Sequence, residues 1–300
     1  MNEAENIPRQ NPDVLKPEER LVLLDASYRL CQIIIQDFPS LNFDWISPET
    51  SGRVMEQTVG RTLQLVAEAR RHAGGFRTRK LPIPQSYRML AGNSSGPGSE
   101  AIVTALELEE QQSTSAEKIL QEAFAADGTL IMPYFSWREI THLRELDLLR
   151  QDNTQRAQEI QKERAVKGRH GPLIVIDEVA GSADTAKEIR RAHGVLNESL
   201  EMCVYVLGKL QRTSYPWVKG AIENIEDVTN LEFIWSDTLK RLRGVRKAVL
   251  GDRRVIEETD LSPDEQRQKV HLEREFETIA QEVARRLLEE GAGIVQQTIN

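Results

Sequence analysis

SPDEQRQKVHLEREFETIAQEVARRLLEEG, residues 262–291, is the stretch of the chain that most clearly decides the fold class. Ser262 is suited to cap a helix, Pro263 fits its first position, and Glu265 completes a capping box. Gly291 is a typical residue to end it. The apolar residues in between recur mostly three and four positions apart, which places them on one face of a helix: Val270, Leu272, Phe276, Ile279, Val283 and Leu287.

Apolar residues at helical spacing extend along most of the chain. Capping residues open several of these segments, and glycines close some of them. Alternation of apolar and polar residues, the pattern of a half-buried strand, is nearly absent. The sequence therefore predicts an all-α protein, predominantly helical, with at most a few short extended segments. Helices are expected at about 17–38, 47–74, 86–91, 99–111, 114–128, 136–149, 184–193, 196–211, 229–249 and 262–291.

A long polar stretch separates two groups of predicted helices. Residues 151–171, QDNTQRAQEIQKERAVKGRHG, are typical of an exposed helix or of a connection between two lobes. A chain of 300 residues also suggests about two domains. The expected organisation is a flexible tail at 1–16, a helical lobe at 17–150, a connection at 151–171, a second helical lobe at 172–291 and a tail at 292–300.

Composition restricts the class of protein further. The net charge is −8, which argues against a generally basic nucleic-acid binder. Cys31 and Cys203 are the only cysteines, so a disulfide framework is excluded and a reducing, cytoplasmic location is expected. The N-terminal residues show no apolar signal segment, and the longest apolar runs, such as Leu173–Ile176, are too short to cross a bilayer. A soluble protein without membrane contact is therefore predicted.

Two stretches suggest a nucleotide site. Residues 92–99, GNSSGPGS, form a glycine-rich segment before a predicted helix, and residues 173–178, LIVIDE, form an apolar run that ends in two acids. Together they resemble the phosphate-binding loop and the magnesium-binding strand of P-loop ATPases. The resemblance implies nucleotide-binding roles for Ser99, Asp177 and Glu178.

The chain departs from that family at several points. Gly98 stands where the family has the lysine that reaches the phosphates, Glu100 would repel an anion, and no strand is predicted before Gly92. Glu139 and His142 share a helical face, but no second such pair completes a two-metal site. No metal, cofactor or catalytic residue is assigned from the sequence, and an enzyme is the less favoured class.

Three clusters of basic residues suggest a surface for an anion on this acidic chain. If the clusters meet in one groove, they suit the backbone of single-stranded nucleic acid. Cations are also common at helix C-terminal ends without any ligand, and this alternative stays open. The candidate phosphate contacts are Arg77, Arg79, Lys80, Arg169, Arg243, Arg246 and Lys247.

These observations favour a non-catalytic assembly or scaffold protein that binds nucleic acid in a basic groove, as a nucleocapsid-like subunit would. Two alternatives remain: an enzyme or NTPase with a degenerate P-loop-like site, and a protein–protein adaptor that does not bind nucleic acid. The short apolar tail after Gly291 is expected to dock on its own chain or on a neighbour, and fraying of the tail is the open alternative. Self-association or a protein partner is therefore expected.

Overall fold

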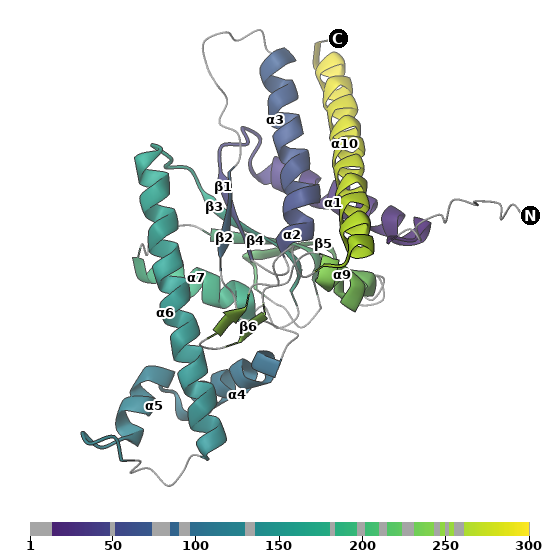
Figure 1. Cartoon of the computed structure of the whole chain (residues 1–300). Helices are drawn as coiled ribbons and strands as arrows, with labels where there is room; N and C mark the ends of the chain where they lie inside the picture. The colour runs from purple at the N-terminus through teal and green to yellow at the C-terminus, as the bar shows by residue number, and fades with distance from the viewer. Residues whose placement is uncertain are drawn as a thin grey trace, which may run out of the picture.

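The centre of the molecule is a five-stranded parallel β-sheet, so the prediction of an all-α protein is wrong (Figure 1). The strands are β1 (Asp44–Pro48), β2 (Ser86–Met89), β3 (Leu173–Ala180), β4 (Met202–Lys209) and β5 (Val218–Ile222), in the order β2-β1-β3-β4-β5. The computed structural model describes residues 14–48, 52–73, 85–89, 97–129, 136–180, 184–196, 202–209, 215–223, 231–242, 247–249, 252–254 and 261–299.

The strands were not predicted from the sequence because helices cover the sheet on both faces. Ile174 and Ile176 of β3 lie in one hydrophobic core, whereas Leu173 and Val175 lie in another on the opposite face. A strand buried on both faces is an unbroken apolar run and lacks the alternation of a half-exposed strand. Strand β4 has the same character, and for this reason it was predicted as part of a helix at 196–211.

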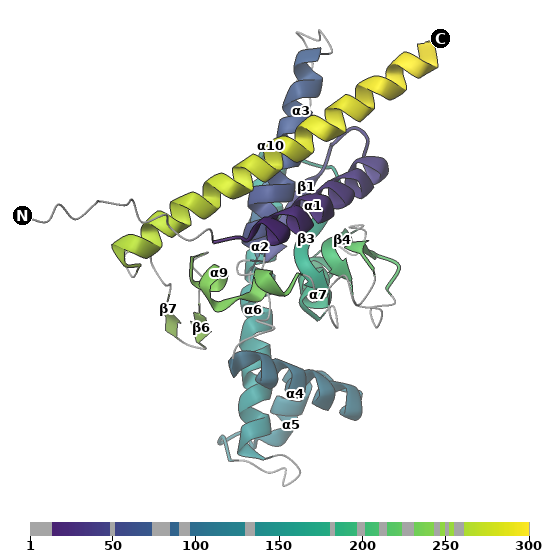
Figure 2. The same ribbon diagram turned by 90° about the vertical axis from the view of Figure 1, so that its right-hand side faces the viewer.

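Helices cover one face of the sheet around the larger core, and Figure 2 shows three of them, α1, α3 and α10, gathered on that side. Strand β1 leads directly into them, because α2, a π-helical turn and α3 follow one another without a break. The elements of this layer are α1 (Pro17–Asp37), α2 (Gly52–Met55), η1 (Glu56–Gly60), α3 (Arg61–Ala73), η2 (Glu232–Trp235), α9 (Asp237–Leu242) and α10 (Pro263–Ile299).

The opposite face is covered by α6 (Trp137–Val166) and α7 (Asp184–Leu196). The first part of α6 also packs with α4 (Pro97–Gln112) and α5 (Ala116–Ala123), which form a small helical lobe with a core of its own. Figure 1 shows α6 running from this lobe along the sheet. The polar residues 151–166, expected to connect two lobes, therefore lie in a helix whose Ala157 and Ile160 pack against the sheet.

Helix ends test the capping predictions individually. The capping box of Ser136 and Glu139 is confirmed at the start of α6, and Ser262 with Glu265 is confirmed at the start of α10. The box predicted at Thr114 is wrong, because Ser115 accepts the hydrogen bond that caps α5. Four further predictions are also wrong: α10 continues past residue 291 to Ile299, and strands are found at 44–48, at 86–89, where a helix was expected, and at 247–249, where β6 pairs with β7 (Asp252–Arg254).

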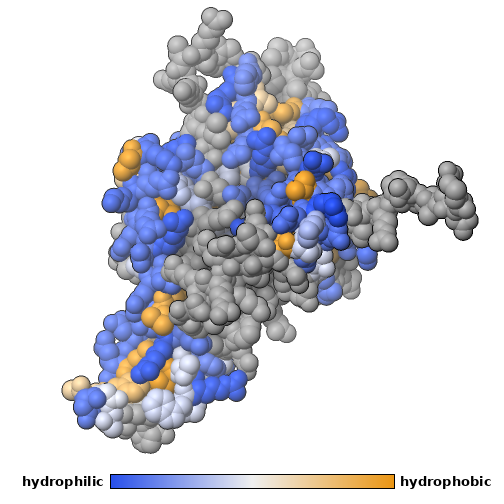
Figure 3. Space-filling model, in the orientation of Figure 1, coloured by the Kyte–Doolittle hydropathy of each residue, from blue (hydrophilic) through white to orange (hydrophobic). Residues whose placement is uncertain are grey.

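On the face drawn in Figure 3, the described residues are mainly hydrophilic. Figure 3 shows its exposed apolar residues in small separate areas, one of them over the helical lobe of α4, α5 and α6. Among the described residues, no helix has both the length and the apolar character that a membrane crossing requires.

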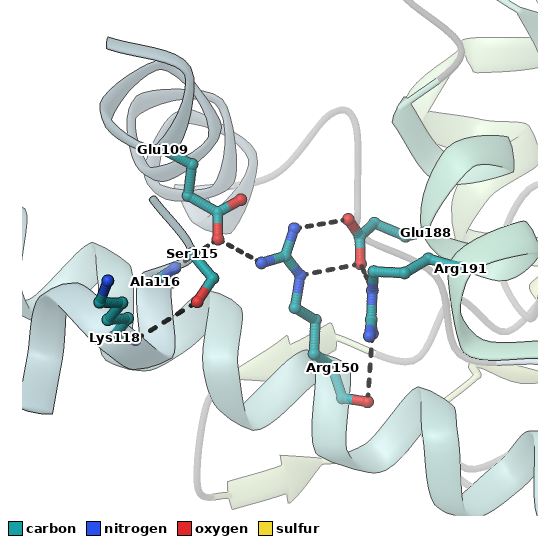
Figure 4. Close-up of polar contacts among 7 residues, drawn as sticks. All are labelled: Glu109, Ser115, Ala116, Lys118, Arg150, Glu188 and Arg191. Atoms are coloured by element: carbon teal, nitrogen blue, oxygen red, sulfur yellow. Dashed lines mark hydrogen bonds and ion pairs between the residues drawn. The ribbon is translucent and has the colours of Figure 1, made fainter. Parts of the chain in front are cut away.

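An ion network joins the small lobe to the sheet (Figure 4). Arg150 of α6 donates to Glu109 of α4 and, at 2.8 and 3.1 Å, to both carboxylate oxygens of Glu188 of α7. Arg191 of α7 donates to Glu188 at 2.9 Å, and Glu109 also accepts from the backbone of Ala116 at the start of α5. One guanidinium thus ties three helices together.

A buried histidine between the sheet and α6 predicts a dependence of stability on pH. Burial, aided by the charge of Arg164, lowers the pKa of His193 to about 4 from its usual 6.5. The unfolded chain therefore binds more protons between these values, and stability falls as the pH falls from about 6.5 to 4. The full loss is about 3 kcal/mol. Urea unfolding across this range, compared with His193→Phe, measures it; an unchanged slope in the variant would contradict it.

Candidate functional site

The strand order identifies one edge of the sheet as the place to look for a ligand. The chain moves from β1 to β2 on one side, and then returns past β1 to add β3, β4 and β5 on the other. The order therefore reverses between β1 and β3. In open parallel α/β sheets, ligands bind in the crevice outside the carboxyl ends of the strands at this switch point.

On the β1 side, Ser47 lies in close contact with Gly52, the first residue of α2. Ser47 is 1% exposed, and its Oγ has no hydrogen-bond partner among the residues that the structure describes. A Cβ added to Gly52, the first residue of α2, would lie 2.4 Å from the Cβ of Ser47. Only glycine fits there. A buried, unpaired hydroxyl thus stands at the end of β1, beside a glycine that begins a helix.

On the β3 side stand two buried acids, Asp177 and Glu178, which are 6% and 1% exposed. The Oδ1 of Asp177 accepts a hydrogen bond of 2.7 Å from the backbone nitrogen of Glu178. Ile46 pairs with Val175, so the register continued along both strands places Pro48 beside Asp177. The two sequence-predicted acids and the β1 turn therefore meet at one edge.

Helix α7 begins at Asp184, six residues after Glu178. Because α7 follows a strand of the sheet, its N-terminus lies on the carboxyl side of β3. The N-terminus of a helix carries a partial positive charge and unpaired backbone N–H groups, which favour an anion. This edge thus combines carboxylates, which attract cations and accept from hydroxyls, with a place suited to a phosphate.

The glycine-rich segment predicted as a phosphate loop has the strand and helix that such loops require. Strand β2 ends at Met89 and α4 begins at Pro97, so the expectation that no strand precedes Gly92 is wrong. Because β2 runs parallel to β1, this segment also leaves from the carboxyl edge. Ser99 belongs to α4, but its side chain lies outside the described residues. The lysine of the ATPase pattern is still missing.

The predicted basic groove stays a prediction. Arg169 lies at the opposite, amino edge of the sheet, where its Nη1 is 3.8 Å from Asp44 at the start of β1. Lys247 begins β6, but its side chain is outside the described residues. The remaining candidates, Arg77, Arg79, Lys80, Arg243 and Arg246, also lie outside them. Within the described part of the chain, no group of three His, Cys, Asp or Glu side chains is arranged to hold a metal ion.

The fold and this edge define an open α/β protein with a candidate ligand site at the switch point of its sheet. No family model, curated protein or solved structure matches the chain.

Sequence reasoning identified Asp177 and Glu178 but missed Ser47 and Gly52. The segment Ser47-Pro48-Glu49 was predicted to open a helix, because serine and proline are common at helix starts. The apolar residues of β1 are too few to predict a strand. The order of the residues could have suggested a strand followed by a turn. A short run containing Trp45 is followed by Ser and Pro, and then by a glycine before a helical pattern.

Proposed function

We propose that this protein binds a phosphorylated ribose at the carboxyl ends of β1 and β3, and that 5-phosphoribosyl 1-diphosphate is the ligand whose groups match the site. The observation that carries the proposal is the pair of buried acids, Asp177 and Glu178, in the carboxyl-terminal half of β3 beside the switch point. The alternative considered from the sequence was an enzyme or NTPase with a nucleotide ligand; the ligand proposed here is a sugar phosphate instead.

The acids suit the hydroxyl groups of the sugar. An ionised carboxylate only accepts hydrogen bonds, and ribose hydroxyls can donate them. Asp177 and Glu178 are consecutive on β3 and face opposite sides of the sheet, so one of the two is placed to accept from a given sugar. Carboxylates near a strand end make this contact in other α/β nucleotide-binding proteins. The sequence between Glu178 and α7 contains Gly181, Ser182 and Ala183, small residues that allow close approach of a 5-phosphate to the N-terminus of α7.

The turn after β1 suits a second phosphate group. The Oγ of Ser47 can donate to a phosphate oxygen, and Gly52 packs closely against Ser47 at the start of α2. A ligand with phosphate at both ends of a ribose would engage both loops. Its negative charge opposes that of the two acids, so a magnesium ion held between the diphosphate and a carboxylate is expected to be required.

The experiment is thermal and urea unfolding of the full chain with 5-phosphoribosyl 1-diphosphate and magnesium. At a ligand concentration a hundred times the Kd, the stabilisation is expected to be about 3 kcal/mol. It is expected to disappear with chelator and in Asp177→Asn and Glu178→Gln, and to weaken in Gly52→Ala. Asp25→Asn, which changes an exposed acid on α1, is the matched control and should keep the response.

Two outcomes would contradict the proposal. Equal stabilisation by ATP and by the ribose ligand would instead support the nucleotide site predicted from the P-loop resemblance. Stabilisation that persists in both acid variants would place the ligand elsewhere on the molecule.

A further inference from the structure

We infer that a second site, on α7 and the residues before β5, binds single-stranded nucleic acid. We call the site the α7 platform and define it as Lys187, Arg190, Tyr215 and Trp217. None of these residues was among the sequence-predicted nucleic-acid contacts, and the site is separate from the carboxyl edge of β1 and β3.

In the platform, each of two cationic side chains lies over one of two neighbouring aromatic rings. The Nζ of Lys187 lies 5.1 Å from the centre of the Tyr215 ring, and the Cζ of Arg190 lies 4.8 Å from the centre of the Trp217 ring. The two rings are 5.1 Å apart and inclined by 32°. Lys187 and Arg190 are three apart on α7 and so share a face of the helix, while a turn from Tyr215 to Val218 brings the two rings together.

Two other charged side chains of α7 point away from this platform. Glu188 and Arg191 point toward Arg150 of α6, where they are paired (Figure 4). Arg190, in contrast, is exposed, and among the described residues no carboxylate lies within ion-pair distance of it. One face of its guanidinium lies on the Trp217 ring, which leaves the other face open to a ligand.

This combination of groups favours nucleic acid over other anions. A guanidinium plane stacks on nucleobases and binds phosphate in a fork, and aromatic side chains add sequence-tolerant stacking of about 1–3 kcal/mol per base. An acidic peptide would use the positive charge but gain nothing from the rings. A purely structural role, holding α7 to the segment before β5, would produce no binding of a polynucleotide at all.

Fluorescence anisotropy with labelled oligouridylate and oligothymidylate tests the inference on the full chain. Binding is expected at low salt and should weaken as salt rises. Arg190→Glu should weaken it by at least about tenfold, the factor that 1.4 kcal/mol represents. Arg190→Gln should reduce the slope of log K against log salt by about 0.7, the value for one phosphate contact in a single strand. Trp217→Phe, which keeps a ring, should retain binding.

Arg274→Gln, which changes an exposed arginine on α10, is the matched control and should bind as the wild type does. Arg190→Gln should also keep its stabilisation by 5-phosphoribosyl 1-diphosphate, so the two proposals can fail separately. Absence of binding at low salt, or equal binding by wild type and Arg190→Glu, would overturn the inference. Displacement of the oligonucleotide by oligoglutamate at equal charge concentration would also overturn it, because the site would then be a surface for acidic peptides.

Discussion

Replacement of Asp44 by alanine is expected to lower the free energy of unfolding by about 3–5 kcal/mol. The Oδ2 of Asp44 accepts from the Nε of Arg164 at 2.8 Å, and both side chains are almost fully buried, at 2% and 7% exposed. Arg164 also donates to the backbone oxygen of Gly171, just before β3. Without Asp44, a buried guanidinium would lose its carboxylate at the point where α6, β1 and β3 meet.

Urea denaturation with linear extrapolation measures this loss. Asp25→Ala, which breaks a pair between Asp25 and Arg29 that is about half exposed, is the matched control and should cost less than about 1 kcal/mol. The double variant Asp44→Leu with Arg164→Met should recover part of the loss, since two apolar residues leave no buried charge unpaired. A cost for Asp44→Ala no larger than that of the control would contradict the prediction.

Replacement of Arg150 by methionine is expected to cost about 3–5 kcal/mol at neutral pH, because the largely buried carboxylate of Glu109 loses its cation and that of Glu188 keeps only Arg191. The side chains of Arg150, Glu109 and Glu188 are 17%, 15% and 7% exposed, so solvent screens the network little. Burial alone would raise the pKa of Glu188, but the hydrogen bonds and charge of Arg150, followed by those of Arg191, outweigh it and lower the pKa below its usual value.

The sign of the pH dependence follows from that shift. In the wild type, Glu188 contributes stability above its unfolded pKa, near 4.5, and the contribution is lost as the pH falls through the lowered folded value. In Arg150→Met, the carboxylate has lost its main cation, and protonation relieves the penalty. The difference between wild type and variant should therefore be largest near pH 7 and narrow toward pH 4.

Urea unfolding at several pH values checks this behaviour. Arg156→Met, on the same helix but in an exposed pair with Glu159, is the control and should show neither the large cost nor the narrowing. A difference for Arg150→Met that stays constant with pH would contradict the account.

The sequence predicted the helices well where one side of a helix faces solvent and failed where an element is buried on both faces. The stripe from Leu272 to Leu287 has a polar side and was assigned correctly, as was the start of α6, but Val270, predicted on the same buried face, is exposed. Strand β4, from Met202 to Lys209, has no polar side. Its sequence therefore shows no alternation of apolar and polar residues, and a helix fits it equally well. The chain's few aromatic residues reinforced the helical expectation, although leucine, isoleucine and valine fill both cores of the sheet.

The candidate site could be predicted only in part for a related reason. Asp177 and Glu178 were found because two acids after an apolar run are visible locally. Their neighbours Ser47 and Gly52 are about 130 and 125 residues away along the chain, and only the pairing of β1 with β3 brings them near. Without the strand order, nothing in the sequence indicates that these segments share an edge.

The long helix α6 joins the small lobe, which is inserted between β2 and β3, to the sheet. Its 30 residues span roughly 45 Å as a single rigid rod, whose first part belongs to the small lobe and whose last part is anchored to β1 through Arg164. After β2 the chain leaves the sheet, and α6 returns it along the sheet to the start of β3. A displacement imposed on the lobe would tilt this rod and strain the junction of β1 and β3 at its far end. A displacement of the insertion is therefore expected to be transmitted to the sheet.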